Sequence, residues 1–174
     1  SSAALGAAAT DRKIIIAFAS YQAADGRTVS SVTVGGVTAT NVITVDGAVG
    51  ANSTIASIYI ASVPTGTTGD VVITFSAPML NCGISVYRMV GGSITPYNTA
   101  SDITVSANAL SASLNIPAGG VAIGVVIAEG GGAPRTWTWT NLTTEDADAT
   151  LENSQSYSSA HDAFTTTQTG LSIT

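Results

Sequence analysis

Apolar residues recur along most of the chain in short runs, and Gly, Pro, Asn and Asp separate one run from the next. β-Branched and aromatic residues dominate these runs, as in residues 12–20, where Ile14, Ile15 and Ile16 precede Phe18. This pattern predicts about ten short strands with turn signals between them. The predicted strands span residues 12–20, 29–34, 37–45, 55–63, 70–76, 83–90, 103–105 with 109–116, 120–128, 136–140, 154–160 and 165–174.

Two consecutive glycines, Gly35 and Gly36, stand between the predicted strands 29–34 and 37–45. Both central positions of a type I′ turn need a positive φ angle, which glycine adopts without a steric cost. The pair therefore predicts a tight hairpin.

The residue types of two other predicted strands indicate how each strand is covered in the fold. Residues 120–128 form the most hydrophobic segment of the chain, which predicts a central strand of the core. In residues 83–90, Ile84 and Val86 alternate with Ser85 and Tyr87, so neither face of that strand is purely polar. We therefore expect its second face to be partly covered by a loop or by a neighbouring molecule.

The fold class predicted from these elements is all-β, a two-sheet antiparallel sandwich of the jelly-roll type. The whole chain, residues 1–174, is expected to form one domain, with residues 1–10 as an extended N-terminal arm. No helical stretch is predicted, and residues 144–153 are the one segment that could hold a helical turn, because several acidic residues there would suit a helix N-terminus.

Charged residues are scarce, at 9% of the chain, against about 25% in a typical soluble domain. The net charge is −6, and Arg12 and Lys13 are the only neighbouring cations. Nucleic-acid binding requires clustered basic residues, so it is excluded as a main role. The longest apolar stretches, such as residues 121–128, are too short to cross a bilayer, so no membrane span is predicted.

Residues suited to catalysis are few. The single histidine, His161, stands beside Asp162, and the chain has no Gly-x-Ser-x-Gly motif. A carboxylate pair for glycoside hydrolysis could include Glu129, Glu145 or Glu152, but spacing in sequence does not define the separation that this chemistry needs. We therefore predict that the protein is not an enzyme, and that His161 lies in a surface loop or at a strand edge.

The densest group of acidic residues comprises Glu145, Asp146, Asp148 and Glu152. Carboxylate oxygens suit Ca²⁺, so a calcium-binding loop is one interpretation. The alternating pattern of an EF-hand is missing, and a solvated acidic loop is the favoured interpretation. Neither a metal nor a cofactor is predicted.

The single cysteine, Cys82, lies in an apolar run, which favours a small buried side chain over a reactive thiol.

Trp137 and Trp139 are separated by one residue. In a strand this spacing places both rings on one face, where they could form a platform for sugars together with Tyr157 on the same sheet face or on a loop rim. The favoured alternative is that the tryptophan pair caps the sandwich core, because aromatic residues are as common in cores as in binding sites.

Several segments taken together resemble a β-sandwich domain that recurs in bacteriophage virion proteins and in some secreted bacterial proteins. They are residues 11–20, 29–37, 58–66, 70–76, 84–89 and 118–126. These segments are strands and turns and contain no functional motif. The resemblance implies a place on the outside of a virus particle, as a capsid decoration, spike, fibre or tail component, or else a carbohydrate-contacting module of a bacterial exoprotein.

A sandwich of this kind normally returns with one more apolar strand than residues 171–174 supply. Either the C-terminal strand is cut short, or a neighbouring subunit supplies the missing strand. The leading hypothesis is a virion structural protein that assembles with copies of itself and with other virion proteins. The alternative is an extracellular or virion-surface module that binds host glycans through Trp137, Trp139 and Tyr157.

Overall fold

The computed structural model describes the chain except for residues 25, 48–51, 105–108, 130–132, 134 and 152–154. The described residues form thirteen strands and no helix, and every strand pair is antiparallel. The predicted all-β antiparallel sandwich is therefore confirmed. None of the described residues belongs to a helix that could cross a membrane.

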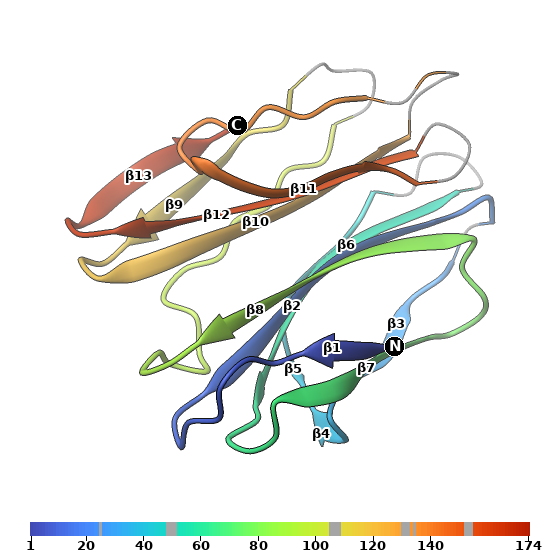
Figure 1. Ribbon diagram of the computed structural model, residues 1–174. Helices are drawn as coiled ribbons and strands as arrows, with labels where there is room; N and C mark the ends of the chain where they lie inside the picture. The colour runs from blue at the N-terminus through green and yellow to red at the C-terminus, as the bar shows by residue number, and fades with distance from the viewer. Residues whose placement is uncertain (25, 48–51, 105–108, 130–132, 134, 152–154) are drawn as a thin grey trace.

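The strands divide into four sheets that lie one above another (Figure 1). The first sheet contains, in spatial order, β1 (Ser2–Ala4), β7 (Thr68–Phe75), β3 (Val29–Val34) and β4 (Val37–Thr38). The second contains β5 (Thr40–Asp46), β6 (Ser53–Ser62), β2 (Lys13–Gln22) and β8 (Asn81–Met89). The third contains β10 (Gly120–Glu129), β12 (Gln155–Phe164) and β11 (Thr144–Thr150), and the fourth contains β13 (Gln168–Ile173) and β9 (Ala112–Ile116).

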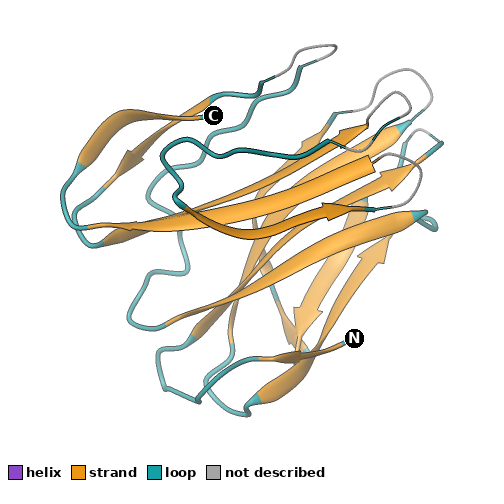
Figure 2. Ribbon diagram, turned by 45° about the horizontal axis from the view of Figure 1, so that its top comes forward, coloured by secondary structure: helices purple, strands orange, loops and turns teal. Residues whose placement is uncertain are grey.

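The second sheet is covered on both faces, as the two views of the ribbon show (Figures 1 and 2). Its strand β2 is buried continuously from residue 14 to residue 21. Ile14, Ile16 and Phe18 pack into the core shared with the first sheet, while Tyr21 reaches Glu129 of the third sheet. A strand covered on both faces needs apolar residues at successive positions. The unbroken run of three isoleucines follows from this burial.

Two apolar cores hold the four sheets in pairs. The larger core lies between the first and second sheets, where Phe18 stacks on Tyr59 at a centroid distance of 5.9 Å and meets Phe75 edge-on at 6.2 Å. The smaller core lies between the third and fourth sheets and includes Leu142 and Ile173. The boundary between the second and third sheets carries hydrogen-bonded side chains, which form the candidate site.

The predicted hairpin at the two glycines is confirmed. Gly35 and Gly36 have φ angles of 56° and 80° and connect β3 to β4. The predicted strand 37–45 is divided at Ala39, because the chain leaves the first sheet after Thr38 and enters the second at Thr40.

The position of β10 differs from the prediction. It was expected to be a central strand, but it lies at the edge of the third sheet, because β12 lies between it and β11. Its apolar residues are explained by coverage of its faces: Gly124 packs under Trp139 and Leu142 on one side, and β10 contacts β2 and β6 on the other. The hydrophobicity of a strand indicates that its faces are buried, and it does not indicate how many strands pair with it.

Other predictions fail locally. Residues 144–150 form strand β11 and not a helical turn, because they pair with β12 along their length. Residues 103–104 and 136–140 are not in strands, and residue 105 lies outside the described residues. The N-terminal arm is in part a strand, since Ser2–Ala4 pairs with β7. The second face of residues 83–90 is covered as expected, but by the third sheet of the same chain and not by a loop or a neighbouring molecule.

Candidate functional site

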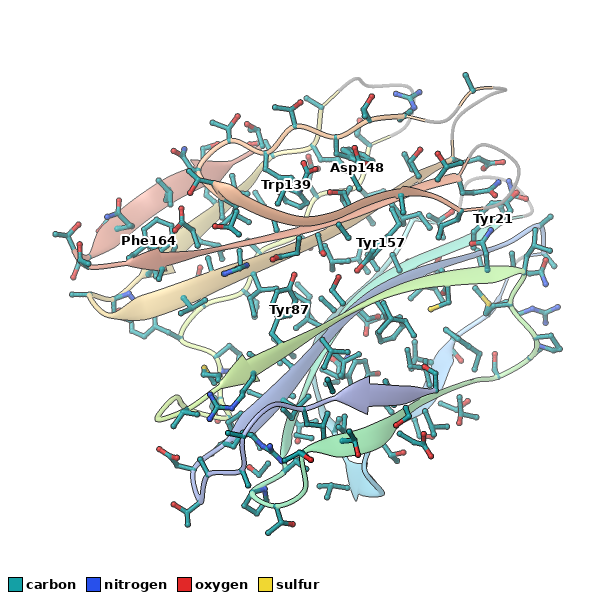
Figure 3. All side chains as sticks on the ribbon, in the orientation of Figure 1. Tyr21, Tyr87, Trp139, Asp148, Tyr157 and Phe164 are labelled. Atoms are coloured by element: carbon teal, nitrogen blue, oxygen red, sulfur yellow. The ribbon has the colours of Figure 1, made fainter. Side chains whose placement is uncertain are left out.

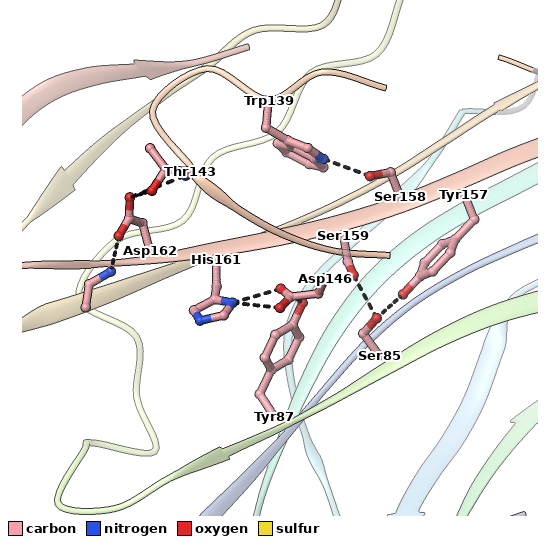
Figure 4. A network of polar contacts seen from close by, with 11 residues as sticks. Ser85, Tyr87, Trp139, Thr143, Asp146, Tyr157, Ser158, Ser159, His161 and Asp162 are labelled. Atoms are coloured by element: carbon pink, nitrogen blue, oxygen red, sulfur yellow. Dashed lines mark hydrogen bonds and ion pairs between the residues drawn. The ribbon is translucent and has the colours of Figure 1, made fainter. Parts of the chain in front are cut away.

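Tyr157 of β12 projects from the third sheet into the second and is 2% exposed. Its hydroxyl donates a 2.7 Å hydrogen bond to Oγ of Ser85, which shares a further 2.7 Å hydrogen bond with Ser159 (Figure 4). Burial is the main reason why the pKa of Tyr157 is raised. The prediction that Tyr157 lies on an open sheet face or loop rim is wrong, because this side chain joins two sheets.

A second polar cluster lies farther along the same boundary and contains Tyr87, Asp146 and His161 (Figure 4). Nδ1 of His161 lies 2.8 Å and 3.0 Å from the two carboxylate oxygens of Asp146. The hydroxyl of Tyr87 donates to Oδ2 of Asp146 at 2.8 Å, and the rings of Tyr87 and His161 meet edge-on with centroids 5.6 Å apart. The cluster therefore connects β8, β11 and β12.

The partner of His161 is not the one that the sequence suggests. Adjacent residues of a strand point to opposite faces, so His161 faces the second sheet, while Asp162 faces away from it and accepts from Thr143. The side chain of His161 is 36% exposed. The expected strand-edge position is wrong, because β12 is the middle strand of the third sheet.

The chemistry of this cluster is hydrogen bonding, and the contact of His161 with Asp146 is an ion pair when the imidazole is protonated. A carboxylate at Nδ1 of a histidine is also part of a catalytic triad, but the triad needs a nucleophile at the other nitrogen. Among the described residues, no serine hydroxyl or thiol bonds to His161. The third member is Tyr87, whose pKa is raised, mainly by burial and further by Asp146. A phenol that stays protonated acts here as a donor to the carboxylate.

The acidic residues of β11 do not converge. A bulge between Glu145 and Ala147 interrupts the strand; Asp146 faces the second sheet, and Asp148 accepts a 3.2 Å hydrogen bond from the backbone N–H of Trp137. Glu152 lies outside the described residues. Within the part of the chain that the structure describes, no three His, Cys, Asp or Glu side chains gather as a metal site requires. The expected acidic loop is an edge strand.

The segment that contains both tryptophans lies across the outer face of the third sheet without joining it as a strand. Its donors bind side chains of the sheet below: the N–H of Arg135 donates to Oγ of Ser156 at 2.6 Å, and Nε1 of Trp139 donates to Oγ of Ser158 at 2.8 Å. The backbone N–H of Trp137 likewise donates to the side chain of Asp148, and that of Thr140 donates to the carbonyl of Thr174. Among the described residues the segment makes no regular ladder with a strand, and residues 136–140 are not a strand.

Of the three residues of the predicted sugar platform, Tyr157 lies apart from the tryptophan-containing segment. The ring of Trp139 packs on Gly124 and against the smaller core, so this residue caps a core as the alternative interpretation held. Figure 3 shows Trp139 on the outer side of the third sheet and Tyr157 on the opposite side. Trp137 is half-buried beside Asp148. Tyr157 therefore does not share an exposed face with Trp139.

Shallow hollows open on the surface of the described residues, among them the following two. The first, of about 220 Å³, lies between residues of the first and second sheets and the segment before β3. It is lined by Arg27, Thr28, Val29, Asn41, Thr44, Asp46, Ile55 and Tyr59. The second, of about 170 Å³, is lined by Arg135, Thr136, Asp148 and Thr150. Both are smaller than the ~300–1,000 Å³ of typical pockets for small-molecule ligands.

The fully buried Arg12 was not recognised from the sequence. Its guanidinium donates to four backbone carbonyls, those of Leu5, Gly6, Val63 and Thr65, at 2.6–3.2 Å. The guanidinium thus ties the segment before β2 to the turn after β6. Arg12 is not available to contact phosphate, although it forms half of the only pair of neighbouring cations in the sequence.

No protein-family model matches the chain, and neither a curated protein nor a solved structure is significantly similar to it. A functional proposal therefore rests on the residues of this chain, on their arrangement and on the resemblance of its strand segments described above.

Proposed function

We propose that the chain is a structural component of a bacteriophage virion and that it acts by assembling with copies of itself and with other virion proteins. The likeness of its strand segments to virion sandwich domains supports the setting. Its low charge and its many Ser, Thr and Gly residues suit packing against other protein surfaces. The observation that carries the proposal is the outer edge of β8.

Strand β8 is a long and regular edge strand. Its nine residues pair with β2 without a register shift, and no described strand pairs with its other edge (Figure 1). An edge of this kind presents backbone N–H and C=O groups to another strand. Strand addition from a second chain is a common way for proteins to use such an edge.

Strand β11, an edge strand of the third sheet, has features that protect an edge from pairing with another chain. It is interrupted by a bulge after Glu145 and carries three acidic residues, and both features discourage pairing with another strand. In contrast, β8 has no bulge, and Arg88 is its only charged residue. Its Ile84 is an exposed apolar side chain, with 40% of its surface accessible. These differences favour β8 over β11 as the assembly edge.

A role without catalysis is part of the proposal. It is supported by the use of His161 in an ion pair that connects strands, and by the small volume of the two hollows. The virion is the proposed location.

The test is the mass of the purified, untagged chain in solution, measured by light scattering across a dilution series. We expect a multimer whose mass falls when Ile84→Lys places a charge beside the free edge of β8. Ile103→Lys is the matched control, because Ile103 is an isoleucine with 53% of its surface exposed that lies in a loop and not on a strand edge. It should leave the mass unchanged. A monomer at every concentration, or equal effects of both variants, would contradict assembly through β8.

A further inference from the structure

The smaller hollow brings together two parts of the chain that lie on the outer side of the third sheet. Asp148 and Thr150 are two residues apart on β11 and therefore share one face. Arg135 and Thr136 come from the tryptophan-containing segment that crosses this face. Hydrogen bonds to Ser156 and to Asp148 fix that segment on the sheet, so the lining residues are held by the fold.

The charged groups of this hollow are not paired with each other. Arg135 and Asp148 both line it, yet the ion pair found among the described residues is that of His161 with Asp146. Oδ2 of Asp148 accepts from the N–H of Trp137, and within the described residues Oδ1 has no partner. The guanidinium of Arg135 likewise bonds to none of them. Among the described residues, a charged donor and a charged acceptor at this hollow thus have no protein partner that would compete with a ligand.

The chemistry of the lining selects the kind of ligand. The guanidinium only donates, the carboxylate only accepts, and the hydroxyls of Thr136 and Thr150 can do both. Because the two charges cancel, an anion would be repelled by Asp148 and a cation by Arg135. A sugar presents neighbouring hydroxyl groups that each donate and accept, and hydrogen bonds to charged groups are the strong ones. A neutral polyhydroxyl compound satisfies all four side chains.

The volume limits the size of that ligand. About 170 Å³ corresponds to roughly six water molecules at ~30 Å³ each. We propose that this hollow binds one neutral sugar residue, such as the terminal residue of a glycan, through Asp148 and Arg135. The site differs from the platform predicted from the sequence, because Trp139 packs against the smaller core and Tyr157 is buried. It also lies on another face than the free edge of β8.

The experiment uses saturation-transfer NMR on the whole chain with four probes: the methyl glycosides of glucose, galactose and mannose, and N-acetylglucosamine. We expect transfer to at least one of them, followed by a titration that gives its affinity. Asp148→Asn keeps an acceptor for the N–H of Trp137 but removes the charge, and Arg135→Ala removes the guanidinium. Each should weaken binding about tenfold, the loss of one charge-assisted hydrogen bond.

The control variant is Asp70→Asn, which makes the same change at an exposed residue on β7 of the first sheet. It should bind as the wild type does, and all variants should unfold at the same denaturant midpoint. No transfer to any probe would overturn the inference, and so would equal binding by the Asp148 and Asp70 variants. Sulfate or acetate binding at the hollow in place of the sugars would also overturn it. None of these results depends on the mass of the chain in solution.

Discussion

The hydroxyl of Tyr157 on β12 donates a 2.7 Å hydrogen bond to Oγ of Ser85 on β8, although the two residues are 72 positions apart in the sequence. This bond crosses the boundary between the second and third sheets. The tyrosine ring fits there because Gly83, two residues before Ser85, has no side chain under it. The packing of the third sheet on the second is therefore specified by the large side chain of Tyr157 on one strand and by a residue without a side chain, Gly83, on the other.

Gly83→Ala should destabilise the protein. A Cβ at this position would lie 2.5 Å from the ring of Tyr157, and the ring is held in a buried place. We expect the free energy of unfolding to fall by about 1–3 kcal/mol, as in other overpacked cores. Chemical denaturation measures the change. Gly47→Ala is the control, since a Cβ there would make only ordinary contacts, at 3.6 Å and beyond. Equal stability of the two variants would refute the packing argument.

The parts of the fold that could be predicted are those whose signal is local. The hairpin at Gly35 and Gly36 depends on two φ angles that glycine favours. Strand β2 is indicated by its consecutive apolar residues. The edge position of β10 could not be predicted, because an edge strand that is covered on both faces has the same composition as a central one. Residues 136–140 have strand-like composition, but the backbone N–H of Trp137 donates to the side chain of Asp148 and not to the carbonyl of a neighbouring strand.

The candidate site was less predictable than the fold, because its members come from distant strands. The pair His161 and Asp146 joins two strands whose register is set by a bulge, and nothing in the spacing of these residues indicates that bulge. The mixed faces of residues 83–90 were the available signal. They indicated a second covered face, which the third sheet provides, but not that Tyr87 and Ser85 would bond to it.

Arg12→Met should be strongly destabilising. The substitution keeps an apolar stem of similar length but removes every donor to the four carbonyls that Arg12 binds. Leaving buried carbonyls without partners costs about 1–3 kcal/mol for each of them that water cannot reach, so we expect a loss of at least ~3 kcal/mol in the free energy of unfolding. Lys13→Met is the control: Lys13 donates to the exposed carbonyl of Asp11, and its loss should change stability by less than ~0.5 kcal/mol. Similar losses for both variants would argue against the role of Arg12.

Cys82 should react slowly with thiol reagents in the folded protein. Burial raises its pKa to about 12, so at pH 8 roughly one thiol in ten thousand is ionised, and the thiolate is the reactive form. We expect labelling by iodoacetamide at pH 8 to become fast only after denaturation. A chain with Cys82→Ser and Ser101→Cys carries its thiol at an exposed position, and it should react at nearly the same rate before and after denaturation. Fast labelling of native Cys82 would contradict its burial.

Asp162 should make the stability of the chain depend on pH in the acidic range. Its pKa is lowered first by the hydroxyl of Thr143 and then by the backbone N–H groups of Ala163 and Thr143. A carboxyl whose pKa is lower in the folded state than in the unfolded state stabilises the fold above its unfolded pKa. That contribution is lost as the pH falls through the folded pKa, below the ordinary value of 3.8. The stability difference between wild type and Asp162→Asn should therefore shrink as the pH falls from 7 to 2.

The pKa of Asp162 itself, followed by carboxyl ¹³C NMR, gives a second measurement. Thr143→Val removes the hydroxyl that donates at 2.7 Å but keeps the backbone N–H that donates at 3.3 Å. The pKa of Asp162 should therefore rise towards its ordinary value in this variant without reaching it. An unchanged pKa would show that the hydroxyl does not stabilise the carboxylate. A stability difference that is independent of pH would show that Asp162→Asn acts through packing and not through charge.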